Sequence, residues 1–111
     1  MDITQTLHIT DRKDWRNWLK KHCKTEKEIW LVYPKKATGK PRISYNDAVE
    51  EALCFGWIDS IAKKFDEDHT AQRFSPRRPK VKYSQANIER LRYLVAKKKV
   101  VKEVVDSLGD I

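Results

Sequence analysis

The side chains with the clearest chemical potential are arginines and lysines in the second half of the chain. Residues 71–102 hold eleven of them and one acidic residue, Glu89, whereas the rest of the chain holds thirteen basic and fifteen acidic residues. The formal charge of +8 therefore arises wholly from this one segment. Clustered arginine and lysine near Tyr83 and Tyr93 have the composition that contacts phosphates and stacks on bases. We expect an anionic partner, with nucleic acid the first candidate, although a solvated face that keeps the domain soluble explains the same charge.

The predicted nucleic-acid interface combines an open sheet face with the run PRRPK that follows the hairpin. Its basic side chains would neutralise backbone phosphates without reading bases. The residues expected to form it are Lys64, Arg73, Arg77, Arg78, Lys80 and Lys82.

Asp59 poses a different question, because strand periodicity places its carboxylate on the same face as Trp57 and Phe65. A carboxylate in apolar surroundings needs a hydrogen-bonded or charged partner, and we expect Lys63 or a helix N-terminus in that role. Alternatively, Asp59 is the polar anchor of a ligand pocket walled by Trp57. Arg73 would hold an anion there if the strand register is shifted by one residue.

The remaining reactive residue types form no recognisable site. Cys23 and Cys54 lack a CxxC spacing, so neither a zinc site nor a disulfide is predicted. His8, His22 and His69 have no nearby Asp or Ser in a triad-like order. No phosphate-binding glycine loop is present either, so we predict no catalytic residues, metal or cofactor and lean away from an enzyme.

Four helices are expected to position these residues. The first begins at Thr10 and the second at Ser44, each of which can cap its helix. Gly56 is suited to end the second helix in a left-handed conformation. A third helix is capped by Ser84, and a short fourth ends at Gly109.

The second helix is predicted to have an apolar side and an acidic side. Its expected core residues are Tyr45, Ala48, Val49, Ala52, Leu53 and Phe55. The opposite side carries Asp47, Glu50, Glu51 and Cys54. Acidic neighbours would raise the pKa of the Cys54 thiol, which argues against a nucleophile there.

Strands are expected at residues 4–9 and 28–33, followed by a hairpin formed by residues 57–65 and 70–75. If Phe65 faces Thr70, the bulky residues of the hairpin share one face, and the other face, with Arg73, is small, basic and open to solvent or ligand. The sequence thus predicts one α+β domain over residues 1–111. Its form would be a two-layer α/β sandwich with a mainly antiparallel sheet, helices on one face and further helices at the C-terminus.

The chain shows neither the pattern of a signal peptide nor an apolar run long enough to cross a membrane. We therefore expect a cytoplasmic protein without membrane insertion. A monomer or weak oligomer is expected, since nothing in the sequence indicates a larger assembly.

Several of these stretches resemble one known family. The run SYNDAVEEALCFGWIDSIAKKFDED, then QRFSPRRPK and YSQAN, is similar to the YdeI/OmpD-associated proteins, which are linked to protection against bacteriocins and other antimicrobial peptides. The resemblance extends from the WRNWL helix to about Lys99. The matching motif positions are Cys54, Gly56, Trp57, Asp59, Arg73, Pro76, Arg77, Arg78 and Asn87.

The resemblance implies a cytoplasmic bacterial or archaeal protein whose family has no settled biochemical activity. It adds Asn87 to the ligand pocket suggested by Trp57 and Asp59. The chain departs from the family where Tyr83 replaces a common Trp, and it ends where many members continue into a further helical segment. Three functions remain open: nucleic-acid binding, a protein- or peptide-binding adaptor in bacteriocin protection, and a small-molecule pocket.

Overall fold

The computed structural model describes residues 2–109, in which four strands are interspersed with helices and two helices follow the last strand. The strands are β1 (Thr6–His8), β2 (Ile29–Pro34), β3 (Trp57–Lys64) and β4 (His69–Pro76). The helices are α1 (Arg12–His22), the short 3-10 helix η1 (Lys36–Thr38), α2 (Tyr45–Cys54), α3 (Gln85–Ala96) and α4 (Lys102–Leu108).

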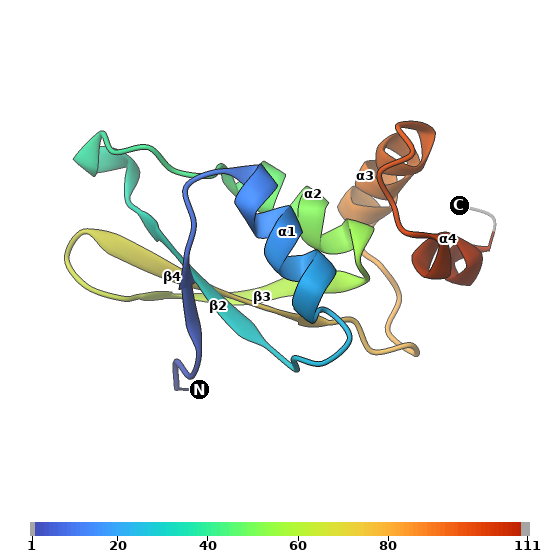
Figure 1. The fold of residues 1–111 in the computed structure, drawn as a ribbon, viewed down its shortest axis with the longest axis horizontal. Helices are drawn as coiled ribbons and strands as arrows, with labels where there is room; N and C mark the ends of the chain where they lie inside the picture. The colour runs from blue at the N-terminus through green and yellow to red at the C-terminus, as the bar shows by residue number, and fades with distance from the viewer. Residues whose placement is uncertain (1, 110–111) are drawn as a thin grey trace.

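The four strands form one sheet in the order β1-β2-β4-β3. β4 pairs antiparallel with both β2 and β3, and the short β1 runs parallel to β2. Helices α1 and α2 lie across one face of this sheet, with α3 and α4 beyond its end (Figure 1). This arrangement confirms the predicted α+β fold with a mostly antiparallel sheet.

The helix ends follow the sequence at four of five predicted positions, including Gly109 at the end of α4. Ser44 and Ser84 accept hydrogen bonds from the third residue of α2 and of α3, as expected. Gly56 follows α2 with φ of 78°, which only glycine adopts without strain. The cap of α1 is Asp11 instead of Thr10, and its side chain accepts from the backbone N–H of Asp14.

The hairpin register differs from the predicted one because β3 contains a β-bulge. Asp59 lies opposite Phe74, but the next paired residue is Ala62, opposite Gln72. The bulge reverses the alternation of β3, so that Lys64, opposite Thr70, lies on the helix-covered face. The prediction that Lys64 shares a face with Arg73 is therefore wrong.

The main core lies between the helices and the sheet. Trp15 and Leu19 from α1, Leu53 from α2, and Leu31 and Phe74 from the sheet are all fully buried there. The opposite sheet face was expected to be open and is so only in part. A smaller cluster of Trp30, Val32 and Ala71, with Ile3 packed against it, covers the part of that face near β2.

Helix α2 is more deeply buried than the helical-wheel projection of its sequence predicts. Glu51 is 1% exposed and Cys54 is fully buried, although both were placed on the solvent side. Tyr45, placed in the core, is 45% exposed. The difference arises because α1 and the segment after α3 cover the flank of α2 that carries Glu51.

Candidate functional site: a basic cavity on the sheet

A cavity of about 550 Å3 lies on the sheet face without helices, where the ends of β3 and β4 meet the segment that follows Pro76. We call it the Arg73 cavity. Three cations and two serine hydroxyls line it together with apolar residues: Lys27, Ile58, Ser60, Arg73, Ser75, Pro76, Arg78 and Val81.

Arg73 is held in a defined position within this cavity. Its Nε donates to Oε1 of Glu28 at 3.1 Å, and Nη1 lies 3.3 Å from the hydroxyl oxygens of Ser60 and Ser75. These partners come from β3, β4 and the residue before β2, so the guanidinium is oriented by the sheet itself. A preorganised guanidinium loses little conformational entropy when it binds an anion.

The other two cations of the cavity are uncommitted. Within residues 2–109, neither Lys27 nor Arg78 uses its side chain in a hydrogen bond or ion pair. Lys27 lies outside the basic segment and was missed by sequence reasoning. Lys27 lies two residues before β2, and the fold brings it beside residues of β3 and β4 that are distant in the sequence. No local sequence signal points to it.

The chemistry of the Arg73 cavity is that of an oxyanion site. Lysine, arginine and serine side chains all donate hydrogen bonds, and the single carboxylate nearby, Glu28, is already paired with Arg73. A phosphate or carboxylate group brings acceptors and negative charge to such donors. Among residues 2–109, those that line the cavity include no aspartate, glutamate or histidine.

Arg77 has a structural role in the loop that borders this cavity. Its guanidinium lies 4.1 Å from the ring centroid of Tyr83 and donates to the carbonyl oxygens of Arg78 and Val81. These contacts fold residues 77–83 into a closed loop. Arg77 is therefore less free to hold a ligand than Arg78, its neighbour.

Lys80 and Lys82 lie on the other side of that loop. They line a second cavity of about 480 Å3 whose walls include Ile88 of α3 and Leu108 of α4. The six predicted nucleic-acid residues thus do not form one patch. Arg73 and Arg78 come together, Arg77, Lys80 and Lys82 surround the adjacent loop, and Lys64 lies at the far end of β3.

The predicted pocket of Trp57, Asp59 and Asn87 is also divided. Trp57 is 1% exposed and donates from Nε1 to the carbonyl oxygen of Cys23 at 3.2 Å, which places it in the core. Asn87 accepts a hydrogen bond from Arg90 at 3.0 Å, and Arg90 also donates to Asn46 of α2. Asn87 therefore helps to join α3 to α2.

Asp59 has two hydrogen-bond donors that sequence reasoning did not name. The hydroxyl of Tyr45 lies 2.8 Å from Oδ2, and Nε2 of Gln72 lies 3.2 Å from the same atom. Gln72 in turn accepts from the hydroxyl of Tyr33 at 2.8 Å. Gln72 shares the face of Asp59 as expected, whereas Tyr45 was placed in the core.

A family model described as a domain of unknown function, DUF8412, matches residues 7–107. The chain belongs to this family. No curated protein and no solved structure matches it. The DUF8412 match includes every residue of the Arg73 cavity. The likeness to YdeI/OmpD-associated proteins stays a prediction from the sequence.

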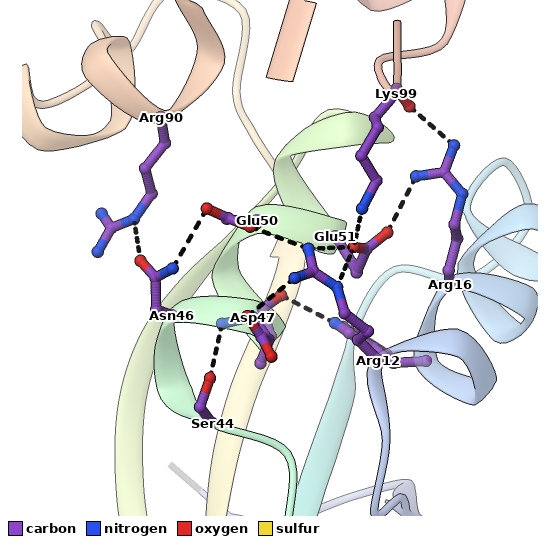
Figure 2. Close-up of polar contacts among 11 residues, drawn as sticks. Arg12, Arg16, Ser44, Asn46, Asp47, Glu50, Glu51, Arg90 and Lys99 are labelled. Atoms are coloured by element: carbon purple, nitrogen blue, oxygen red, sulfur yellow. Dashed lines mark hydrogen bonds and ion pairs between the residues drawn. The ribbon is translucent and has the colours of Figure 1, made fainter. Parts of the chain in front are cut away.

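A partly buried ion-pair network around the buried carboxylate of Glu51 joins helices of the DUF8412 domain beside the core (Figure 2). The carboxylate of Glu51 accepts from Arg12 at 2.7 Å, from Arg16 at 2.9 Å and from Lys99 at 2.8 Å. Arg12 also pairs with Asp47 and Glu50, at 2.9 Å each. Three cations thus face three carboxylates, and this balance indicates a structural cluster without excess charge for a ligand.

The thiols of the DUF8412 domain are not activated. Burial raises the pKa of Cys54, although a hydrogen bond with Arg16 opposes the effect, and burial also raises the pKa of Cys23. Within residues 2–109, His, Cys, Asp and Glu side chains form no group of three that would hold a metal ion. No helix in the same range is both long and apolar enough to cross a bilayer.

Proposed function

We propose that this domain binds nucleic acid through its phosphate backbone at the Arg73 cavity. The observation that carries the proposal is the meeting of Lys27, Arg73 and Arg78 with two serine hydroxyls on a sheet face free of helices. Arg73 supplies an oriented guanidinium, while Lys27 and Arg78 supply cations that have no acidic partner within residues 2–109.

The surroundings of the cavity support a long polyanion over a single small anion. Lys80 and Lys82 lie on the loop beside it and extend the basic surface toward α3 and α4. A phosphate chain crossing residues 77–83 would meet cations on both sides of the loop. Such contacts recognise the charge and spacing of phosphates and carry no base sequence. The proposal takes the domain to act in the cytoplasm as a monomer or weak oligomer.

Fluorescence anisotropy with a labelled 20-mer, single-stranded or duplex, tests the proposal over a series of salt concentrations. Neutralising five phosphates on duplex DNA, one for each of Lys27, Arg73, Arg78, Lys80 and Lys82, gives a slope of about −4.5 in a plot of log K against log salt. Lys27→Gln together with Arg78→Gln removes two contacts and should reduce that slope by about 1.8. All oligonucleotide sequences should be affected alike.

Lys20→Gln together with Lys21→Gln is the matched control, because it removes the same charge from the exposed surface of α1. If both double variants lose the same affinity for the oligonucleotide, binding does not depend on a local site. The basic residues would then serve to keep the domain soluble. A polyglutamate peptide of equal charge is the second comparison. If it binds as tightly as DNA, the partner is an acidic protein segment and the nucleic-acid proposal is wrong.

A further inference from the structure

A third cavity lies between residues 36–42 and the start of α2, on the helix-covered side of the sheet. Its volume is about 740 Å3, within the range of cavities that hold small ligands. It shares no residue with the Arg73 cavity. We call it the Tyr45 cavity, and the lining residues that matter here are Lys36, Lys40, Arg42, Ser44, Tyr45 and Asn46.

Tyr45 provides a fixed aromatic wall to this cavity. The side chain is 45% exposed, yet its hydroxyl is anchored to Asp59 at 2.8 Å. Burial and the bond to Asp59 both raise the pKa of Tyr45, so the phenol keeps its proton and continues to donate at neutral pH. Asp59 itself is held by Gln72 from β4. The ring is therefore positioned before any ligand arrives.

The charged wall of the cavity is entirely basic. Arg42 lies 4.9 Å from the ring centroid of Tyr33 and donates to the carbonyl oxygen of Pro34 at 3.1 Å, which fixes its position. Within residues 2–109, the side chains of Lys36 and Lys40 form no ion pair or hydrogen bond. In the described part of the chain, the lining includes no aspartate or glutamate, and the carboxylate of Asp59 behind it is paired with the Tyr45 hydroxyl. An anionic ligand would thus meet three cations and no repelling carboxylate.

We propose that the Tyr45 cavity binds a free nucleotide, with the base stacked on Tyr45 and the phosphates held by Lys36, Lys40 and Arg42. Aromatic rings are general platforms for bases, because every base has a π-face. Lysine and arginine bind phosphate oxygens by charge-assisted hydrogen bonds. This site is independent of the proposed nucleic-acid surface, since the two cavities lie on opposite faces of the sheet.

Isothermal titration calorimetry with ADP tests the proposal on the whole chain. Tyr45→Leu removes the platform and should weaken ADP binding about tenfold, whereas Tyr45→Phe keeps the ring, loses only its anchor to Asp59 and should weaken binding less. Lys36→Gln with Lys40→Gln should also weaken it about tenfold. The matched charge control, Lys20→Gln with Lys21→Gln, should bind ADP as the unmodified chain does.

Two comparison ligands and one variant complete the test. Pyrophosphate should bind more weakly than ADP, and a 5′-phosphorylated tetranucleotide should gain nothing over ADP. Equal binding of pyrophosphate and ADP, tighter binding of the tetranucleotide, or no ADP-induced shift in backbone NMR signals of residues 36–46 would each overturn the proposal. Lys27→Gln with Arg78→Gln should leave ADP binding unchanged. A failure of the nucleic-acid proposal for the Arg73 cavity can therefore be distinguished from a failure of the nucleotide proposal for the Tyr45 cavity. Thermal melting checks that Tyr45→Leu is folded. If Tyr45→Leu does not fold, the affinity of Tyr45→Phe for ADP is compared with that of the unmodified chain instead.

Discussion

Lys99 and Glu51, 48 residues apart in the chain, form an ion pair in which Nζ lies 2.8 Å from Oε2. The contact joins α2 to the segment that links α3 to α4. Arg16 strengthens the same junction, since it binds Glu51 through one nitrogen and the carbonyl oxygen of Lys99 through another. One buried carboxylate therefore connects α1, α2 and the C-terminal helices.

Glu51→Gln should destabilise the domain by about 3 kcal/mol, near the lower end for one lost partner of a buried ion pair. The value is at the low end because the side chains of Arg12, Arg16 and Lys99 are about one-third exposed and regain hydration. Urea unfolding measures the change in the free energy of unfolding. Glu50→Gln is the control, since Glu50 pairs only with Arg12 among these cations. Equal effects of the two substitutions would contradict the central role of Glu51.

The same carboxylate should make stability depend on pH. Burial alone would raise the pKa of Glu51, but hydrogen bonds from Lys99, Arg16 and Arg12 outweigh it and lower the pKa below its ordinary value of 4.5. A lowered folded-state pKa adds stability that is complete above the unfolded-state pKa and is lost as pH falls through the folded-state pKa. The unmodified chain should lose more stability than Glu51→Gln between pH 6 and pH 3. Parallel urea-derived stability curves for the two proteins would refute this.

Gly56→Ala should be more harmful than Gly39→Ala. Both glycines have positive φ, 78° and 68°, so alanine costs about 1–2 kcal/mol at either position. An added Cβ at Gly56 would also lie 3.3 Å from Cγ2 of Val104, whereas at Gly39 it would meet nothing within 4 Å. Denaturant unfolding of both variants isolates this contact. If the two substitutions lower the free energy of unfolding equally, α4 does not pack closely against Gly56 in solution.

The two thiols should differ in reactivity. Cys23 is half-buried and Cys54 is fully buried, and both thiols have a raised pKa. Alkylation with iodoacetamide at pH 8, followed by mass spectrometry, should modify Cys23 slowly and Cys54 only when the domain unfolds. Cys23→Ser should then leave a folded protein that takes up almost no reagent. Rapid modification of Cys54 in that variant would show that α2 opens readily.

The local elements of this fold were predictable because their signals are local. Ser44 and Ser84 cap helices where short polar side chains precede apolar periodicity, and Gly56 ends α2 where a left-handed residue is required. The strand faces were predictable only as far as Asp59. The bulge between Asp59 and Ala62 reverses which side chains face the helices. The alternating pattern of the sequence does not indicate where an extra residue is inserted.

The candidate site was predictable in composition and less so in arrangement. Charge clustering pointed to Arg73 and Arg78, but Lys27 reaches the cavity from the segment before β2, and its place beside β3 and β4 is a long-range property. The burial of Glu51 could not be predicted for the same reason. Its burial depends on Arg12, Arg16 and Lys99 arriving from distant positions, so a helix wheel of α2 alone assigns it to solvent.

The strand order leaves β1 and β3 as the two outer strands of the sheet. β1 is three residues long, and β3 carries the bulge and ends in Lys63 and Lys64. Short length, a bulge and lysine are devices that prevent a sheet margin from pairing with another chain. The bulge that reverses the faces of β3 thus also protects the protein against aggregation. Deletion of the extra residue between Asp59 and Ala62 should give β3 a regular exposed edge. We expect such a variant to precipitate at a lower protein concentration.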